Sequence, residues 1–161
     1  MFCFSFTLFS SRVSKLTLFV AAIALIVIAP AQLHAQRSEP EPAFSDFKGV
    51  RIGTSADESR RKLGNPRDKG DDQDFYVFND TQAVQIFYDK TAKVSAISID
   101  YMTGASGIPS PKEVLGTEAD KKPDGSVYKL VRYPKAGYWV SYSRTAGDSP
   151  TTTVTMQKIE H

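Results

Sequence analysis

Residues 53–66 read Gly-Thr-Ser-Ala-Asp-Glu-Ser-Arg-Arg-Lys-Leu-Gly-Asn-Pro, and this stretch predicts a short helix with defined ends. Thr54 or Ser55 supplies the N-cap, acidic residues follow in the first turn where the helix dipole favours them, and basic residues occupy the last turn. Gly64 then ends the helix and Pro66 prevents its continuation. The helix has a thin apolar stripe, so it needs a sheet to pack against.

The end of this helix recurs in the second half of the chain. Leu63-Gly64 returns as Leu115-Gly116, 52 positions later, and Tyr76 returns as Tyr128 at the same spacing. Ser110-Pro111-Lys112-Glu113 begins the second helix with a capping box and a proline at its first position. Three strand candidates with turn signals between them follow each helix, at 75–78, 83–88 and 94–101, and at 127–133, 137–144 and 152–159.

These elements predict an α+β fold made of two α-β-β-β repeats, with an antiparallel sheet of about six strands and two short helices on one face. The repeats cover about 50–102 and 108–160, within a tandem-repeat domain spanning 47–161. Residues 36–46 carry two prolines among polar residues and are predicted to be a flexible linker. Chance similarity of short segments is the alternative to a true repeat.

An alignment of the two halves sorts the strand residues into two faces. At an offset of 54, Val84, Ile86 and Tyr88 align with Tyr138, Val140 and Tyr142, and we expect these residues to lie under the helices. The alternation of side chains along a strand then places a second set on the opposite, solvent-facing side. We expect this second set to form the ligand- or partner-binding surface, and it consists of Trp139, Phe87, Phe75, Val77, Val127 and Lys129.

The first 35 residues are typical of an export signal. Arg12 and Lys15 precede an apolar run from Leu16 to Ala29, and a segment that ends in Leu33-His34-Ala35 follows. We expect cleavage after the small residue Ala35, and Ala31 is a second candidate. The apolar run has about 14 residues, which is short of the roughly 20 that a spanning helix needs. A periplasmic or secreted location is therefore expected, and an uncleaved membrane anchor is the alternative.

Composition argues against several classes of function. Removing residues 1–35 takes away two basic residues and leaves 18 of each sign, so the mature chain carries no bulk positive charge for nucleic acid. The single cysteine, Cys3, and His34 both lie in the leader, and only His161 remains as histidine. No Ser-His-Asp or Cys-His arrangement is therefore available, and we expect no enzyme activity, no cofactor and no metal site.

Two acidic features stay open as alternatives. The loop 68–74 gathers several aspartates that calcium would accept as ligands, but its spacing differs from an EF-hand loop and we interpret it as solvated. Asp100 beside Glu113 or Glu118 would provide the carboxylate pair of a glycoside hydrolase. Any chain this rich in acids offers such pairs.

From Gly53-Thr54 through Leu63-Gly64-Asn65-Pro66, with a tyrosine-bearing strand after it, the chain resembles the SmpA/OmlA and β-lactamase-inhibitor-protein-like group. The resemblance covers residues 50–160 as two copies, the second without the proline. It implies a small exported binding module: an accessory lipoprotein of outer-membrane assembly, or an inhibitor that binds a secreted enzyme through a concave sheet. The chain lacks the lipid-bearing cysteine of the first and the disulfides of the second.

The sequence therefore predicts an exported, non-catalytic binding module of the cell envelope that engages a protein or envelope component through its open sheet face. A membrane-tethered structural protein and a carboxylate-dependent hydrolase are the alternatives. No nucleic-acid partner is expected, and membrane association is expected only if the leader stays uncleaved.

Overall fold

A computed structural model of the chain describes residues 42–160. The predicted leader and most of the predicted linker lie outside this part. The described elements are two α-helices, one 3-10 turn and seven strands: α1 (Ala56–Leu63), β1 (Asp68–Lys69), β2 (Gln73–Asn79), β3 (Gln82–Tyr88), β4 (Val94–Tyr101), α2 (Pro111–Leu115), β5 (Val127–Tyr133), η1 (Pro134–Ala136), β6 (Tyr138–Arg144) and β7 (Thr152–Lys158). Among the residues described, no helix is long and apolar enough to cross a membrane.

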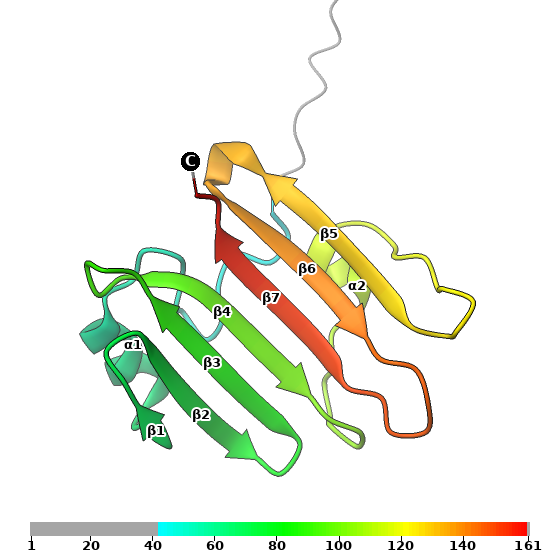
Figure 1. The fold of residues 1–161 in the computed structure, drawn as a ribbon, viewed down its shortest axis with the longest axis horizontal. Coiled ribbons are helices and arrows are strands. Elements are labelled where there is room, and N and C mark those ends of the chain that lie inside the picture. The colour runs from blue at the N-terminus through cyan, green and yellow to red at the C-terminus, as the bar shows by residue number, and fades with distance from the viewer. Residues whose placement is uncertain (1–41, 161) are drawn as a thin grey trace, which may run out of the picture. The chain divides into compact units, whose positions relative to one another are not determined.

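The strands form one antiparallel sheet in the order β1-β2-β3-β4-β7-β6-β5 (Figure 1). β2 to β4 make one meander and β5 to β7 make another, and the pairing of β4 with β7 joins the two. The expected α+β class with an antiparallel sheet is confirmed, but the sheet has seven strands where six were predicted. The additional strand is β1, where Asp68 lies opposite Phe75 because the chain after α1 folds back onto β2.

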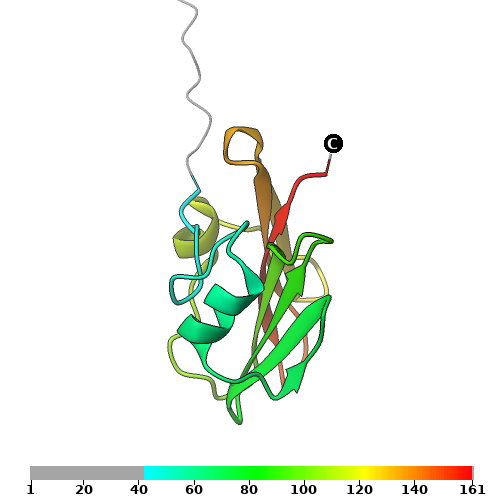
Figure 2. The ribbon, with the colours of Figure 1, turned by 90° about the vertical axis from the view of Figure 1, so that its left-hand side faces the viewer.

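Both helices lie on the same side of the sheet (Figure 2). The core fills the space between, and its strand residues alternate with residues on the other side, as one-sided burial requires. The fully buried apolar side chains of the strands all belong to this core: Val84, Ile86, Val94, Ile97, Ile99, Val140, Val154 and Met156.

The predicted helix ends are confirmed. Ser55 is the N-cap of α1 and its side chain accepts a hydrogen bond from the backbone N–H of Glu58, while Gly64 ends the helix with a φ of +88°. In α2 both hydrogen bonds of the capping box between Ser110 and Glu113 are present. The apolar contribution of α1 is as thin as expected, since the helix buries only Ala56 and Ser59.

The folded part begins earlier than the predicted boundary at residue 47. Phe44 packs against the core, and the Tyr138 hydroxyl donates a hydrogen bond of 3.5 Å to its carbonyl oxygen. Phe47 is buried as well. The last residues of the predicted linker are therefore part of the domain.

The sequence alignment of the two halves of the chain agrees with the structure at the offset of 54 but not at the offset of 52. The offset of 54 places Tyr138, Val140 and Tyr142 in the core, as expected. At the offset of 52, however, Tyr76 is 3% exposed in the core whereas Tyr128 is 51% exposed on the opposite face. Because strand side chains alternate, a slip of one residue moves a whole strand to the wrong face.

The joint core between β4 and β7 can be tested with a pair of substitutions. Ile97→Ala removes a fully buried side chain that lies opposite Met156. We expect it to lower the free energy of unfolding by about 2 to 5 kcal/mol, measured by urea denaturation, because it leaves a cavity in the core. Gln157→Ala, on β7 but exposed on the other face, should change it by less than about 0.5 kcal/mol. Equal effects would contradict one-sided burial.

Candidate functional site

No described element covers the face of the sheet opposite the helices (Figure 2), and we call it the open face. The register places its side chains in three rows that cross the sheet from β2 to β5. The first row is Gln73, Phe87, Ala96, Gln157, Trp139 and Arg132; the second is Phe75, Gln85, Ser98, Thr155, Ser141 and Leu130; the third is Val77, Ala83, Asp100, Thr153, Ser143 and Tyr128.

Four of the six predicted binding residues lie on the open face. Trp139, Phe87 and Phe75 are partly exposed there, and Val77 is 42% exposed. Phe87 and Trp139 belong to the same row, with β4 and β7 between their strands. The three strand spacings from β3 to β6 separate their backbones by about 14 Å.

Val127 and Lys129 are not on the open face, and their predicted placement is wrong. They lie opposite Arg144 and Tyr142 in the register, on the helix-covered side. The Lys129 ammonium donates a hydrogen bond of 2.6 Å to the carbonyl oxygen of Glu118, which follows α2. The error comes from the offset of 52, which aligned these two residues with Phe75 and Val77 and shifted β5 by one residue.

The middle of the open face is polar and composed of small side chains. We call Ser98, Asp100, Thr153, Thr155, Ser141 and Ser143 the central strip. The Ser98 and Thr155 hydroxyls lie 3.2 Å apart, and the Thr153 hydroxyl donates a hydrogen bond of 2.7 Å to Asp100. Large apolar side chains border the strip on both sides: Phe75, Val77 and Phe87 on β2 and β3, and Trp139, Leu130 and Tyr128 on β6 and β5.

The helix-covered side contains a buried carboxylate that is not among the predicted site residues. Asp74 is fully buried at the start of β2. It accepts hydrogen bonds from Arg60 Nε at 2.8 Å and Nη2 at 3.0 Å, and from the Tyr88 hydroxyl at 2.7 Å. The Tyr76 hydroxyl and the backbone N–H of Gly70 complete the group at 3.5 and 3.3 Å. We call Asp74, Arg60, Tyr76 and Tyr88 the Asp74 cluster.

The cluster shifts the proton affinities of its members. Burial by itself raises the pKa of Asp74, but the hydrogen bonds from Arg60 and Tyr88 outweigh it, so the pKa lies below its ordinary value. Burial and the adjacent Asp74 charge raise the pKa of Tyr76 to about 12. The pKa of Tyr88 is raised too, by burial and by its hydrogen bond to Asp74. The carboxylate thus stays ionised and the phenols stay neutral near pH 7.

A sequence signal for the Asp74 cluster existed. Asp74, Tyr76 and Phe78 follow one another at a period of two, which places Asp74 on the same face as the buried Tyr76. A buried carboxylate needs a cation, and Arg60 lies in the helix expected on that face. The interpretation of loop 68–74 as solvated is wrong for Asp74, which is buried.

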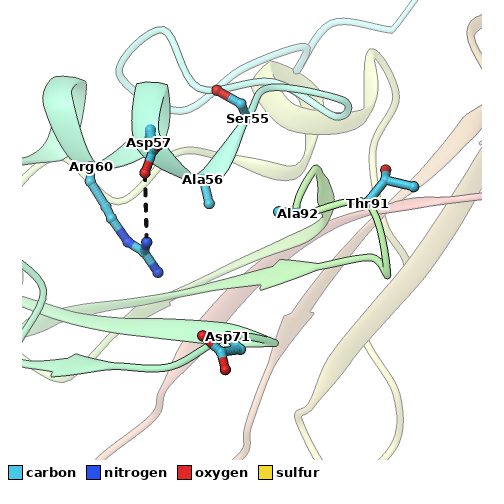
Figure 3. Close-up of a pocket in the computed structure, with 7 residues that line it drawn as sticks. All are labelled: Ser55, Ala56, Asp57, Arg60, Asp71, Thr91 and Ala92. Atoms are coloured by element: carbon cyan, nitrogen blue, oxygen red, sulfur yellow. Dashed lines mark ion pairs between the residues drawn. The ribbon is translucent and has the colours of Figure 1, made fainter.

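A small pocket opens beside the cluster, between α1 and the turn from β3 to β4. Its volume is about 210 Å³, and its lining is Ser55, Ala56, Asp57, Arg60, Asp71, Thr91 and Ala92. Figure 3 shows the Arg60 guanidinium in the space below α1, with Asp57 above it at 3.9 Å. The carboxylates of Asp57 and Asp71 line the pocket together with the Arg60 guanidinium, so the pocket offers no uniform charge to an ion.

The other acidic candidates are not brought together. Asp100 lies on the open face, whereas α2 with Glu113 is on the covered side and the Glu113 carboxylate caps its own helix. The proposed carboxylate pair with Glu113 is therefore wrong. Glu118 lies beyond α2, where its carbonyl oxygen holds Lys129 of the covered face. Within residues 42–160, no group of three or more His, Cys, Asp or Glu side chains is arranged to hold a metal ion.

Comparison with known proteins gives few matches. No protein-family model matches the chain, and no curated protein matches it. Among solved structures, the fold is similar to a DUF4309 family protein (YjgB) from Bacillus subtilis, at 18% sequence identity and a TM-score of 0.47. The match covers 70% of this chain and 84% of that protein. The similarity is too low to transfer a function.

Substitution of Asp74 tests whether the cluster holds α1 to the sheet. Asp74→Asn keeps the shape but leaves the Arg60 charge without its partner, so we expect a loss of about 2 to 4 kcal/mol in the free energy of unfolding, measured by urea denaturation. Asp57→Asn is the matched control, since that carboxylate is 88% exposed and 3.9 Å from the same guanidinium. It should cost less than about 0.5 kcal/mol.

The lowered pKa of Asp74 also predicts an acid dependence. A group whose pKa is lower in the folded than in the unfolded chain stabilises the fold above the unfolded value, about 3.9 for aspartate, and this contribution is lost as the pH falls through the folded value. The free energy of unfolding should therefore fall below about pH 4. The Asp74→Asn variant should show a shallower fall over the same range, and parallel curves would contradict the assignment.

Proposed function

We propose that this protein is an exported, non-catalytic binding module that engages a protein or an envelope component through the open face. The observation that carries the proposal is the one-sided coverage of the sheet. Helices and core occupy one side, and the other presents Trp139 and Phe87 partly exposed in a single row. Exposed aromatic side chains on a rigid sheet are typical of binding surfaces, since a fixed backbone lowers the entropic cost of binding.

Export is supported by the charged, apolar and small-residue segments in residues 1–35. On this proposal the protein is periplasmic or secreted, and a leader that stays uncleaved would tether it to a membrane. N-terminal sequencing of the protein from cells separates the two, because cleavage after Ala35 leaves Gln36 as the first residue.

We also propose that the two halves are tandem copies of one α-β-β-β unit. Each half contains one helix and, after it, a three-stranded meander; the first half adds the two-residue strand β1 between them. The last strands of the two meanders, β4 and β7, pair with each other. The helices end in the same Leu-Gly pair, with positive φ at Gly64 and Gly116. The SmpA/OmlA-like resemblance fits this arrangement.

The non-catalytic assignment rests on the residue types available. After removal of the leader, the sequence holds no cysteine and a single histidine at its last position. The buried carboxylate Asp74 is fully engaged by Arg60 and two tyrosines, which suits a structural role. The catalytic alternative is a carboxylate-dependent hydrolase, and the three rows of the open face hold no second acid beside Asp100.

A double substitution on the open face tests the proposal. Purified wild-type protein is incubated with the envelope fraction of the source cells, and retention is compared with that of Trp139→Ala/Phe87→Ala. We expect the double variant to lose at least about nine-tenths of the retained material, because two aromatic contacts are removed together. Met102→Ala/Ile108→Ala is the matched control, since both residues are exposed apolar side chains outside the sheet, at 42% and 39%. Equal retention by all three proteins would overturn the proposal.

A further inference from the structure

The open face has an unusual distribution of side chains. Protein-binding surfaces commonly have an apolar centre and a polar rim, and serine and threonine are rare among the residues that dominate binding. Here the order is reversed. The centre is the central strip, with five hydroxyl side chains and one carboxylate, and the apolar side chains form its two borders. This arrangement disfavours a protein as the ligand.

The formal charges on the open face exclude further classes of ligand. In the three rows, only Asp100 and Arg132 carry a formal charge, and they lie in different rows and three strand spacings apart. On β1, Asp68 adds a negative charge beside Phe75. Lys129, which would have added a positive charge beside the aromatic residues, lies on the covered side. The face therefore offers neither the positive charge that a polyanion requires nor a continuous apolar area for lipid chains.

Neutral glycans match these properties. A sugar unit presents hydroxyls that both donate and accept hydrogen bonds, and the Ser and Thr hydroxyls of the strip have the same dual capacity. The Asp100 carboxylate accepts one bond from Thr153 and has acceptor capacity left for sugar hydroxyls. The C–H groups on the flat side of a sugar ring are weakly positive and are attracted to the negative face of an aromatic ring, as Trp139 and Phe87 provide.

We propose that the ligand of the open face is a neutral glycan, with sugar rings packed on Trp139 and Phe87 and sugar hydroxyls bonded to the central strip. The inference rests on the proposed function and specifies its ligand. The two aromatic residues are in one row with their backbones about 14 Å apart, a span that an oligosaccharide bridges and a single sugar does not. Binding should therefore require several linked units.

The chain provides its own reporter for this proposal, because Trp139 is the only tryptophan. The full-length protein is screened on an array of neutral and anionic oligosaccharides, and the neutral glycans retained are titrated while the tryptophan emission is recorded. Cellohexaose and chitohexaose are titrated in every case, with glucose and N-acetylglucosamine as the single-unit controls. We expect a saturable emission change with at least one neutral oligosaccharide and none with the single sugars.

Variants assign the contacts. Asp100→Asn should weaken the affinity at least about tenfold, since it removes a charge-assisted hydrogen bond at a half-buried position of the open face without touching the core. Phe87→Ala should reduce the affinity for the long oligosaccharide to that for a shorter one, because the second aromatic platform is lost. Met102→Ala should bind as the wild type does. Circular dichroism of each variant checks that it is folded.

The proposal is overturned if no neutral glycan is retained, if only anionic glycans are, or if Asp100→Asn and Phe87→Ala both bind as tightly as the wild type. One further result distinguishes a failure of the glycan proposal from a failure of the proposed binding function. If the envelope experiment yields a protein partner that Trp139→Ala/Phe87→Ala no longer retains, while no neutral glycan binds, the binding module stands and its ligand is a polypeptide.

Discussion

The pairing of β4 with β7 makes a single domain out of two meanders. Each meander alone would leave the edge of its last strand unpaired and its apolar side chains half-covered. Across this pairing Ile97 faces Met156 and Ile99 faces Val154, and all four side chains are buried on the helix side. The same register aligns Ser98 with Thr155 and Asp100 with Thr153 on the open face. The core and the central strip therefore depend on one set of backbone hydrogen bonds.

The two helices are attached to the sheet by different means. α2 is short and packs through Val114 and Leu115, both buried. α1 has little to bury, and the Asp74 cluster holds it through Arg60 instead. An ionic attachment of this kind is specific in geometry but sensitive to the loss of either partner. It also explains how a helix with charged residues on most of its surface keeps a fixed position.

Local patterns in the sequence predict the helices and most of the strands correctly. They fail for residues whose placement depends on the register between strands. Caps, glycines and alternation located both helices and six of the strands, because these signals act within a few residues. The placement of Val127 and Lys129 needed the register of β5, which the partner strand β6 determines and which a comparison of the halves shifted by one. β1 has only two residues, too few to carry a pattern, and forms because β2 offers it an edge. Asp74 was missed because its polarity suggested a loop, although its spacing from Tyr76 indicated the core.

The position of Phe44 has a consequence for how the domain can be attached to anything else. The described chain enters along the covered side, where Phe44 packs against the core and Tyr138 bonds to its carbonyl oxygen (Figure 2). The polypeptide thus reaches the sheet on the face opposite the one that carries Trp139. A tag, a fusion partner or an immobilising linker joined directly to residue 42 would begin on the covered side, away from the aromatic surface. The domain can therefore be displayed on a bead or a sensor chip through its N-terminal side with its candidate binding surface facing the solution.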